Sequence, residues 1–278
     1  AMSNKEKLIL EHEGQAALSE MGELTPDPDD TTSQAEIDEP PALSPAVSIP
    51  IDGQWQDFPS VSAAEKASYA DFKAASHRNA QNFHITDNDL GAGGAKAKFQ
   101  ANLNAIQLLK HLEAEGLQAS PDQQQVLSRY VGWGGLPDAF DESKPGWASE
   151  YQALKAALTP EEYTAARAST LNAHYTSPTV IRAIYEAVGN MGFQTGNILE
   201  PSMGIGNFFG MLPENMQSSR LYGVELDSIT GRIAKQLYPK ANITIAGFET
   251  TDRRDFFDLA VGNVPFGQYK VNDPAYNK

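Results

Sequence analysis

The chain has 278 residues, of which 41% are hydrophobic, and a mean hydropathy of −0.42, values that suit one large or two small globular domains. It contains no cysteine, which excludes disulfides, thiol catalysis and zinc–thiolate sites, and no apolar run approaches the roughly 18 residues of a membrane span. The net charge of −15 is uneven, because residues 1–57 hold 13 acidic and 2 basic side chains whereas the rest hold 23 and 19. The body of the chain therefore lacks the broad basic surface of an autonomous DNA-binding domain.

The first 60 residues are predicted to be a disordered acidic linker. Residues 20–50 consist largely of Asp, Glu, Pro, Ser and Thr, and such a segment cannot bury enough apolar surface to offset its ordering entropy. A short helix is expected near residues 7–21. Nucleic-acid mimicry is the alternative interpretation of the acidic charge, but composition favours a solvated linker.

Residues 61–170 are predicted to form a helical subdomain. Phe99, Leu103, Ile106, Leu109 and Leu112 recur at helical spacing and form one apolar stripe. Ser-Pro at 120–121 and Thr-Pro-Glu-Glu at 159–162 place a capping residue before a proline at the first helical position. The glycine-rich stretch 91–94 is expected to be a loop and not a P-loop, because the Gly-Lys-Ser/Thr ending is missing.

From residue 171 to residue 278 short apolar strands alternate with helical stretches. We predict a helix from Ser177 to about Met191, and strands over residues 197–200, 221–225, 243–246 and 258–262. Strands separated by helices indicate a parallel sheet with right-handed crossovers. The fold class is therefore α/β and Rossmann-like.

A ligand-binding turn is predicted after the first of these strands. The strand runs through Glu200 into a turn with Gly204 and Gly206 and then into a helix, and glycines there let the backbone approach a ligand closely. Glu225 ends the next strand, 21 residues after Gly204, where a carboxylate accepts hydrogen bonds from both hydroxyls of a ribose. The alternative is that Glu225 is an ordinary surface acid.

The sequence Asn263-Val264-Pro265-Phe266 follows the last predicted strand. It resembles the fourth motif of the amino-methyltransferases, in which Asn or Asp is followed by two prolines and an aromatic residue. An exocyclic amine becomes nucleophilic when two acceptors engage its N–H groups, and the resemblance assigns these roles to the Asn263 side chain and the carbonyl of residue 264. Phe266 would stack on the flipped base. Val264 replaces the family's first proline and would supply the same carbonyl with less rigidity.

Two further segments are similar to motifs of the same family. Residues 173–178 look like the segment that closes over the methionine end of the cofactor, S-adenosyl-L-methionine, and they include Tyr175 and Thr176. Residues 245–249 occupy the third-motif position, where Phe248 would pack on the adenine ring. Gly247 stands where the family often has an aspartate that reads the adenine amine.

The motif order resembles that of the gamma-ordered N6-adenine DNA methyltransferases. Residues 127–141, which include Trp133, are similar to the very large helicase–methyltransferase proteins of conjugative elements and phages, and this resemblance covers roughly residues 80–278. Trp133 is either a base-stacking wedge or a buried aromatic plug between the helical part and the sheet, and the plug is the favoured interpretation.

The resemblance implies a Rossmann-like S-adenosylmethionine-dependent methyltransferase core, incomplete at its C-terminus, in a cytoplasmic protein without membrane partners or metal. DNA would be the substrate, the later strands and a helicase would lie on a longer parent chain, and these 278 residues alone would bind cofactor weakly without methylating DNA. The alternatives are an RNA or protein-glutamine methyltransferase and a non-catalytic interaction or DNA-positioning module. The implied catalytic residues are Asn263, Val264, Pro265 and Phe266, and the implied cofactor-binding residues are Tyr175, Thr176, Glu200, Pro201, Gly204, Gly206, Glu225 and Phe248.

Overall fold

The computed structural model describes residues 47–264, apart from 59, 89 and 172–175. The described chain begins with an antiparallel hairpin of β1 (Val47–Ile51) and β2 (Gln54–Phe58). Its two-residue turn has positive φ at both Asp52 and Gly53, 48° and 77°, and Asp-Gly is a preferred sequence for such a turn. The hairpin lies within the range predicted to be a disordered linker, so that prediction needs correction for residues 47–58. The Asp-Gly turn preference outweighed the acidic composition on which the linker prediction rested. The predicted helix near residues 7–21 lies outside the described residues.

Helices follow the hairpin through residue 171, as the sequence indicated. The apolar stripe of α3 (Ala95–Glu115) is buried, and the helix ends at Gly116 in the left-handed conformation. Both predicted proline starts are confirmed, because Ser120 and Thr159 each form a reciprocal capping box with the residue three positions later. The elements are α2 (Val61–Arg78), α3 (Ala95–Glu115), α4 (Pro121–Leu127), α5 (Ala148–Ala157) and α6 (Pro160–Ala168), with short 3₁₀ turns at Pro137–Phe140, Pro145–Trp147 and Ser169–Leu171.

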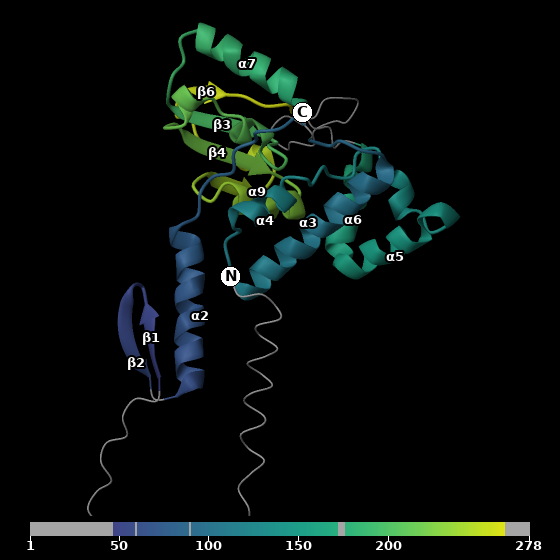
Figure 1. The fold of residues 1–278 in the computed structure, drawn as a ribbon. Coiled ribbons are helices and arrows are strands. Elements are labelled where there is room, and N and C mark those ends of the chain that lie inside the picture. The colour runs from purple at the N-terminus through teal and green to yellow at the C-terminus, as the bar shows by residue number, and fades with distance from the viewer. Residues whose placement is uncertain (1–46, 59, 89, 172–175, 265–278) are drawn as a thin grey trace, which may run out of the picture. The chain divides into compact units, whose positions relative to one another are not determined.

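The second half carries a parallel four-stranded sheet. Its strands lie in the order β5 (Asn242–Ile245), β4 (Arg220–Glu225), β3 (Asn197–Pro201) and β6 (Leu259–Ala260). This confirms the four predicted strands, although the last is only two residues long, and it is compatible with an α/β Rossmann-like fold. The chain moves outward from β3 to β4 to β5 and then returns to place β6 on the other side of β3 (Figure 1). The elements are α7 (Pro178–Asn190), β3 (Asn197–Pro201), α8 (Asn207–Gly210), β4 (Arg220–Glu225), α9 (Ser228–Leu237), β5 (Asn242–Ile245) and β6 (Leu259–Ala260), with 3₁₀ turns at Glu214–Met216 and Phe248–Thr250.

The helical part packs against α9, which lies beside α3 and α4 (Figure 1). The Gln124 side chain donates hydrogen bonds to the carbonyls of Gln236 and Leu237, 3.1 and 3.2 Å away, in the last turn of α9. From the same helix, Arg232 forms ion pairs with Glu113 on α3 and Glu162 on α6. One hydrophobic core extends through these helices and the sheet. The core does not separate the helical part from the sheet, so the domain boundary predicted at residue 170 stays a prediction.

Trp133 is a core residue, as its favoured interpretation required. It is 1% exposed, and its ring centroid lies 6.0 Å from that of Phe99 and 5.3 Å from that of Phe140. A base-stacking role needs an exposed ring face, which Trp133 lacks. Among the described helices none is both long and apolar enough to cross a bilayer.

Candidate functional site

The carboxyl ends of the four parallel strands bring most of the predicted site residues to one edge of the sheet. The turn with Gly204 and Gly206 follows β3, Glu225 ends β4, Phe248 follows β5, and Asn263 follows β6. The chain reverses its direction of travel between β3 and β6, and ligands of open α/β sheets bind outside the strand ends at such a reversal. The topology therefore places the glycine turn and the Asn263 loop at the expected crevice.

The turn after β3 adopts a conformation that requires glycine. Gly204 and Gly206 have φ of 59° and 86°, and between β3 and Gly204 the non-glycine Ser202 has φ of 58°, a conformation that is uncommon and tends to mark functional sites. A Cβ atom on Gly206 would lie only 2.6 Å from Cε2 of Tyr238. The turn is therefore held in one shape by its surroundings. Gly206 is buried, whereas Gly204 is partly exposed and leaves its backbone open to close approach.

Glu225 joins the end of β4 to this turn. Its Oε2 atom accepts a hydrogen bond from the Gly204 N–H at 2.8 Å, and its Oε1 atom accepts one from the Asp227 N–H at 2.8 Å. Burial raises the pKa of the Glu225 carboxyl, while these two backbone amides favour the carboxylate. Each carboxylate oxygen can accept more than one hydrogen bond, so Glu225 retains acceptor capacity for a ligand hydroxyl.

Glu200 lies beneath the same turn and is 3% exposed. Burial raises the pKa of its carboxyl well above the usual range, and the neighbouring Glu225 raises it further, against the favourable backbone amides of Phe208 and Phe209. Its Oε2 atom has no hydrogen-bond partner among the described residues, and neither does Oδ1 of the buried Asn207. Buried acceptors without donors are uncommon and call for an explanation, and a ligand with donor or cationic groups in the adjacent turn would supply one.

The loop after β6 passes directly beside Glu200. A Cβ atom on Gly262 would lie 3.4 Å from the Pro201 carbonyl oxygen and 3.5 Å from Cγ of Glu200. The next residues, Asn263 and Val264, are exposed. Pro265 and Phe266, like Tyr175, lie outside the described residues, so no contact of theirs bears on the site. Thr176 is partly buried ahead of α7, and no hydrogen bond among the described residues joins it to the turn.

Two exposed apolar side chains lie where β4 and β5 end, and the Glu249 side chain lies against Gly247 in the turn after β5. Phe248 is 49% exposed, and Leu226, which follows Glu225, is 75% exposed. The two strand ends meet where the Ala246 N–H donates to the Glu225 carbonyl oxygen at 2.9 Å. Sequence reasoning missed Leu226, although it directly follows Glu225, and it gave no role to Glu249 within the segment 245–249.

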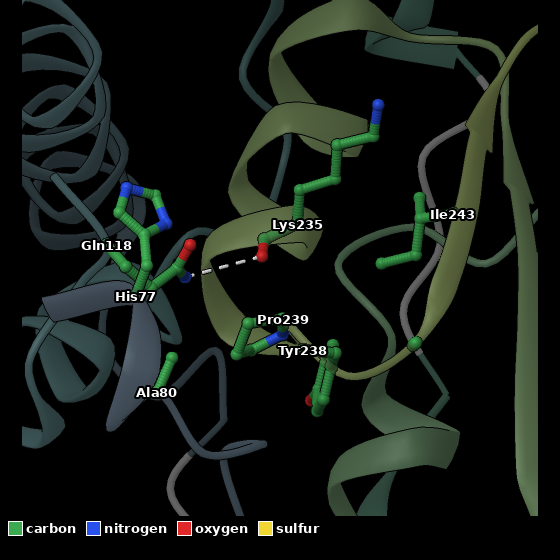
Figure 2. Close-up of a pocket in the computed structure, with 8 residues that line it drawn as sticks. His77, Ala80, Gln118, Lys235, Tyr238, Pro239 and Ile243 are labelled. Atoms are coloured by element: carbon green, nitrogen blue, oxygen red, sulfur yellow. Dashed lines mark hydrogen bonds between the residues drawn. The ribbon is translucent and has the colours of Figure 1, made fainter. Parts of the chain in front are cut away.

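Two cavities of the described structure lie away from this edge. One of about 310 Å³ is lined by His77, Gln118 and Lys235, among others, at the seam between the helical part and α9 (Figure 2). Across this seam the Gln118 side chain donates to the Gln236 carbonyl at 2.9 Å. The other, of about 340 Å³, lies between α7 and the segment around Met211. Neither is lined by a predicted site residue.

The chain is similar to two known proteins. It is 31% identical over 171 residues to the Defense against restriction protein B of Escherichia phage P1. It is 35% identical over 83 residues to the type II methyltransferase M.CvrRI of Paramecium bursaria Chlorella virus XZ-6E. The matches cover 60% and 30% of this chain but only 6% and 21% of those proteins. No protein-family model matches the chain, and no solved structure matches it. The similarities support a relationship to methyltransferases.

Proposed function

We propose that this chain carries the S-adenosylmethionine-binding part of a DNA methyltransferase that modifies adenine at N6. The observation that carries the proposal is the contact between Glu225 and the Gly204 amide, which joins a ribose-binding acid to a glycine turn at the reversal point of the sheet. The similarity to a viral type II methyltransferase supports the same reaction class. Because the chain spans a small part of its relatives, the later strands and a gamma-ordered helicase–methyltransferase parent are part of the proposal.

The cofactor would lie along the carboxyl edge of β3, β4 and β5. Gly204 lets the backbone approach its methionine part, and Glu225 accepts hydrogen bonds from the ribose hydroxyls. Gly206 is buried and remains a proposed cofactor residue on the family resemblance. Glu200 lies next to the turn, where its Oε2 atom has no hydrogen-bond partner among the described residues, and it remains a proposed cofactor residue on the family resemblance. Leu226 and Phe248 offer apolar surface for the adenine ring. Pro201, Tyr175 and Thr176 remain proposed cofactor contacts on the family resemblance alone.

The target amine would be held by the loop after β6, next to Glu200 and the glycine turn. The Asn263 side-chain oxygen and the Val264 carbonyl accept the two N–H groups of the amine, which frees its lone pair for attack. When bound, the cofactor supplies an electrophilic methyl group for direct in-line displacement. Pro265 and Phe266 would complete this loop and stack on the flipped base. The near-neutral body of the chain leaves duplex binding to other parts of the protein.

Calorimetry with S-adenosylmethionine on the full chain tests the cofactor assignment, and we expect binding at a single site. Complete absence of binding would overturn the proposal. Tritiated S-adenosylmethionine is then supplied with mixed-sequence DNA, ribosomal RNA and a glutamine-containing protein fraction, both to this chain and to the longer parent protein. We expect no transfer by the chain alone. With the parent protein, label in N6-methyladenine of DNA supports the proposal, label in RNA or glutamine supports a different amino-methyltransferase, and cofactor binding without transfer to any substrate supports a non-catalytic module.

A further inference from the structure

The seam between the helical part and α9 holds the cavity of about 310 Å³ shown in Figure 2. Its walls come from three stretches of the chain, which are the end of α2 with the residues after it, the connection between α3 and α4, and the stretch from α9 to the start of β5. Small-molecule sites have volumes of about 300–1,000 Å³. The cavity is therefore large enough for a small ligand, and it lies away from the strand ends that carry the candidate site.

Hydrogen bonds between these stretches hold the cavity in shape. The Gln118 side chain donates to the Gln236 carbonyl oxygen at 2.9 Å, and the Ala119 N–H donates to Oε1 of Gln236 at 2.8 Å. On the side of α2, Nε2 of His77 lies 3.2 Å from the Gly116 carbonyl oxygen. Because these bonds form within the protein, a ligand does not have to order the walls when it binds.

The charged side chains of the cavity are basic. No Asp or Glu is among the residues that line it. Lys235 is exposed, and within the described part of the chain its ammonium group forms no hydrogen bond or ion pair. Because a carbonyl oxygen only accepts, Nε2 of His77 carries a proton toward Gly116, and Nδ1 has no hydrogen-bond partner among the described residues. The Lys73 ammonium lies nearby, 3.9 Å from a Cβ atom built on Gly116. This excess of positive charge attracts an anion.

The carbonyl groups that end α9 would repel an anion, but they are already engaged. The Gln236 carbonyl accepts hydrogen bonds from the side chains of Gln118 and Gln124 at 2.9 and 3.1 Å. The Leu237 carbonyl accepts one from the Gln124 side chain at 3.2 Å and one from the Phe83 N–H at 2.8 Å. The basic side chains therefore determine the electrostatic potential in the cavity.

The remaining wall of the cavity is apolar. Ala80, Pro239, Ala241 and Ile243 line it, and Figure 2 shows Pro239 and Ile243 on the side away from His77. Apolar walls with a few polar groups are typical of small-molecule sites. The cavity therefore offers a basic side for an anionic group and an apolar side for the body of the same ligand.

We propose that this cavity binds a phosphomonoester with an apolar body. The phosphate contacts the Lys235 ammonium and Nδ1 of His77, which donates when the ring is protonated, and the body packs on Pro239 and Ile243. A phosphomonoester carries a charge of about −1.5 to −2 at pH 7 and three acceptor oxygens, so it can contact two basic side chains at once. Lysine binds phosphate as a compact point charge. The site is separate from the proposed cofactor site and does not depend on it.

Calorimetry on the full chain with phenyl phosphate tests the proposal. We expect binding at one site, at least about tenfold tighter than the binding of inorganic phosphate, which lacks the body, and of phenylacetate, which lacks the phosphate. Lys235→Gln should weaken the binding of phenyl phosphate by at least about tenfold, the effect of one charge-assisted hydrogen bond. Lys66→Gln is the charge-matched control. Lys66 is an exposed residue near the start of α2, so this variant should retain the wild-type affinity.

A second variant changes the volume of the cavity and leaves every charge in place. Ala80→Leu fills space at the apolar wall, so it should abolish the binding of phenyl phosphate while keeping a cooperative melting transition. Saturating S-adenosylhomocysteine should leave the affinity for phenyl phosphate unchanged, because the cavity lies away from the strand ends.

Five results would overturn the proposal. They are wild-type affinity in Lys235→Gln, binding retained by a folded Ala80→Leu, competition by S-adenosylhomocysteine, equal affinity for phenylacetate, and no binding of phenyl phosphate to the wild-type chain. If Ala80→Leu does not fold, the comparison of Lys235→Gln with Lys66→Gln decides the assignment. None of these results bears on the proposed methyltransferase function.

Discussion

Replacing Glu225 with alanine should weaken both the glycine turn and the binding of cofactor. The substitution removes the acceptor of the Gly204 and Asp227 amides, each at 2.8 Å. A hydrogen bond to a charged group contributes about 1.5–3 kcal/mol, but burial raises the pKa of this carboxyl, which shows that its charged form is partly destabilised by desolvation. Allowing for that opposing effect, we expect a loss of about 2 kcal/mol in the free energy of unfolding.

The same substitution should lower the affinity for S-adenosylmethionine by at least tenfold, because two bonds to the ribose hydroxyls are lost as well. Calorimetry measures this affinity, and urea denaturation measures the stability. Asp227→Ala is the matched control. Asp227 is the N-cap of α9, and its Oδ1 atom accepts the Thr230 N–H at 2.8 Å. Removing this cap should lower the free energy of unfolding by about 1 kcal/mol, and it removes no proposed ligand contact.

The comparison between these two variants decides the assignment. If Glu225 binds the ribose, Asp227→Ala should bind cofactor within about threefold of the wild type despite its lower stability. Affinity of Glu225→Ala within a factor of two of the wild type would refute the ribose assignment. Equal weakening in both variants would show that the loss follows from local unfolding of the turn.

Three further predictions concern stability. Gly206→Ala should lower the free energy of unfolding by more than about 2 kcal/mol, because it places a side chain on a left-handed backbone with its Cβ 2.6 Å from Tyr238. Gly146→Ala is the control and should be nearly neutral, because open space surrounds Gly146. Equal effects of the two substitutions would contradict the steric argument. Burial raises the pKa of Glu200, so its ionisation opposes folding: Glu200→Gln should match or exceed the wild-type melting temperature at pH 7, with the difference shrinking as the pH falls toward the unfolded value of about 4.5. A higher melting temperature of the wild type at pH 7 would contradict the prediction that ionisation of Glu200 opposes folding. Burial alone would raise the pKa of Glu162, but hydrogen bonds from Lys110, the Thr159 amide and Arg232 outweigh it and lower that pKa to about 2. Its stabilisation is present above about pH 4.5 and is lost as the pH falls toward 2, so acid melting curves should be flatter for Arg232→Met, and parallel curves would argue against the ion pairs.

The amino-acid sequence by itself determined the elements whose signals are local. The proline-and-cap starts at Ser120 and Thr159 satisfy the backbone donors of their own first turn, so neighbouring residues suffice to predict them. The α3 stripe and the strands around Glu200 and Glu225 follow from apolar periodicity. The glycines at 204 and 206 predicted a turn between a strand and a helix, and the structure showed that both have positive φ. The Asp-Gly turn of the hairpin was equally local, but the acidic composition around it concealed the signal.

Tertiary structure decided the chemical environment of those residues. Burial of Glu200 depends on α8 and on the return of the chain to form β6, which brings Gly262 beside it from 62 positions away. Packing of the helical part on α9 depends on Arg232 and Gln124, whose partners are more than 60 residues distant. The position of the Glu249 carboxylate follows from a side-chain conformation over Gly247. Long-range contacts of this kind depend on how the helices and the sheet pack against one another, and no local sequence pattern predicts that packing.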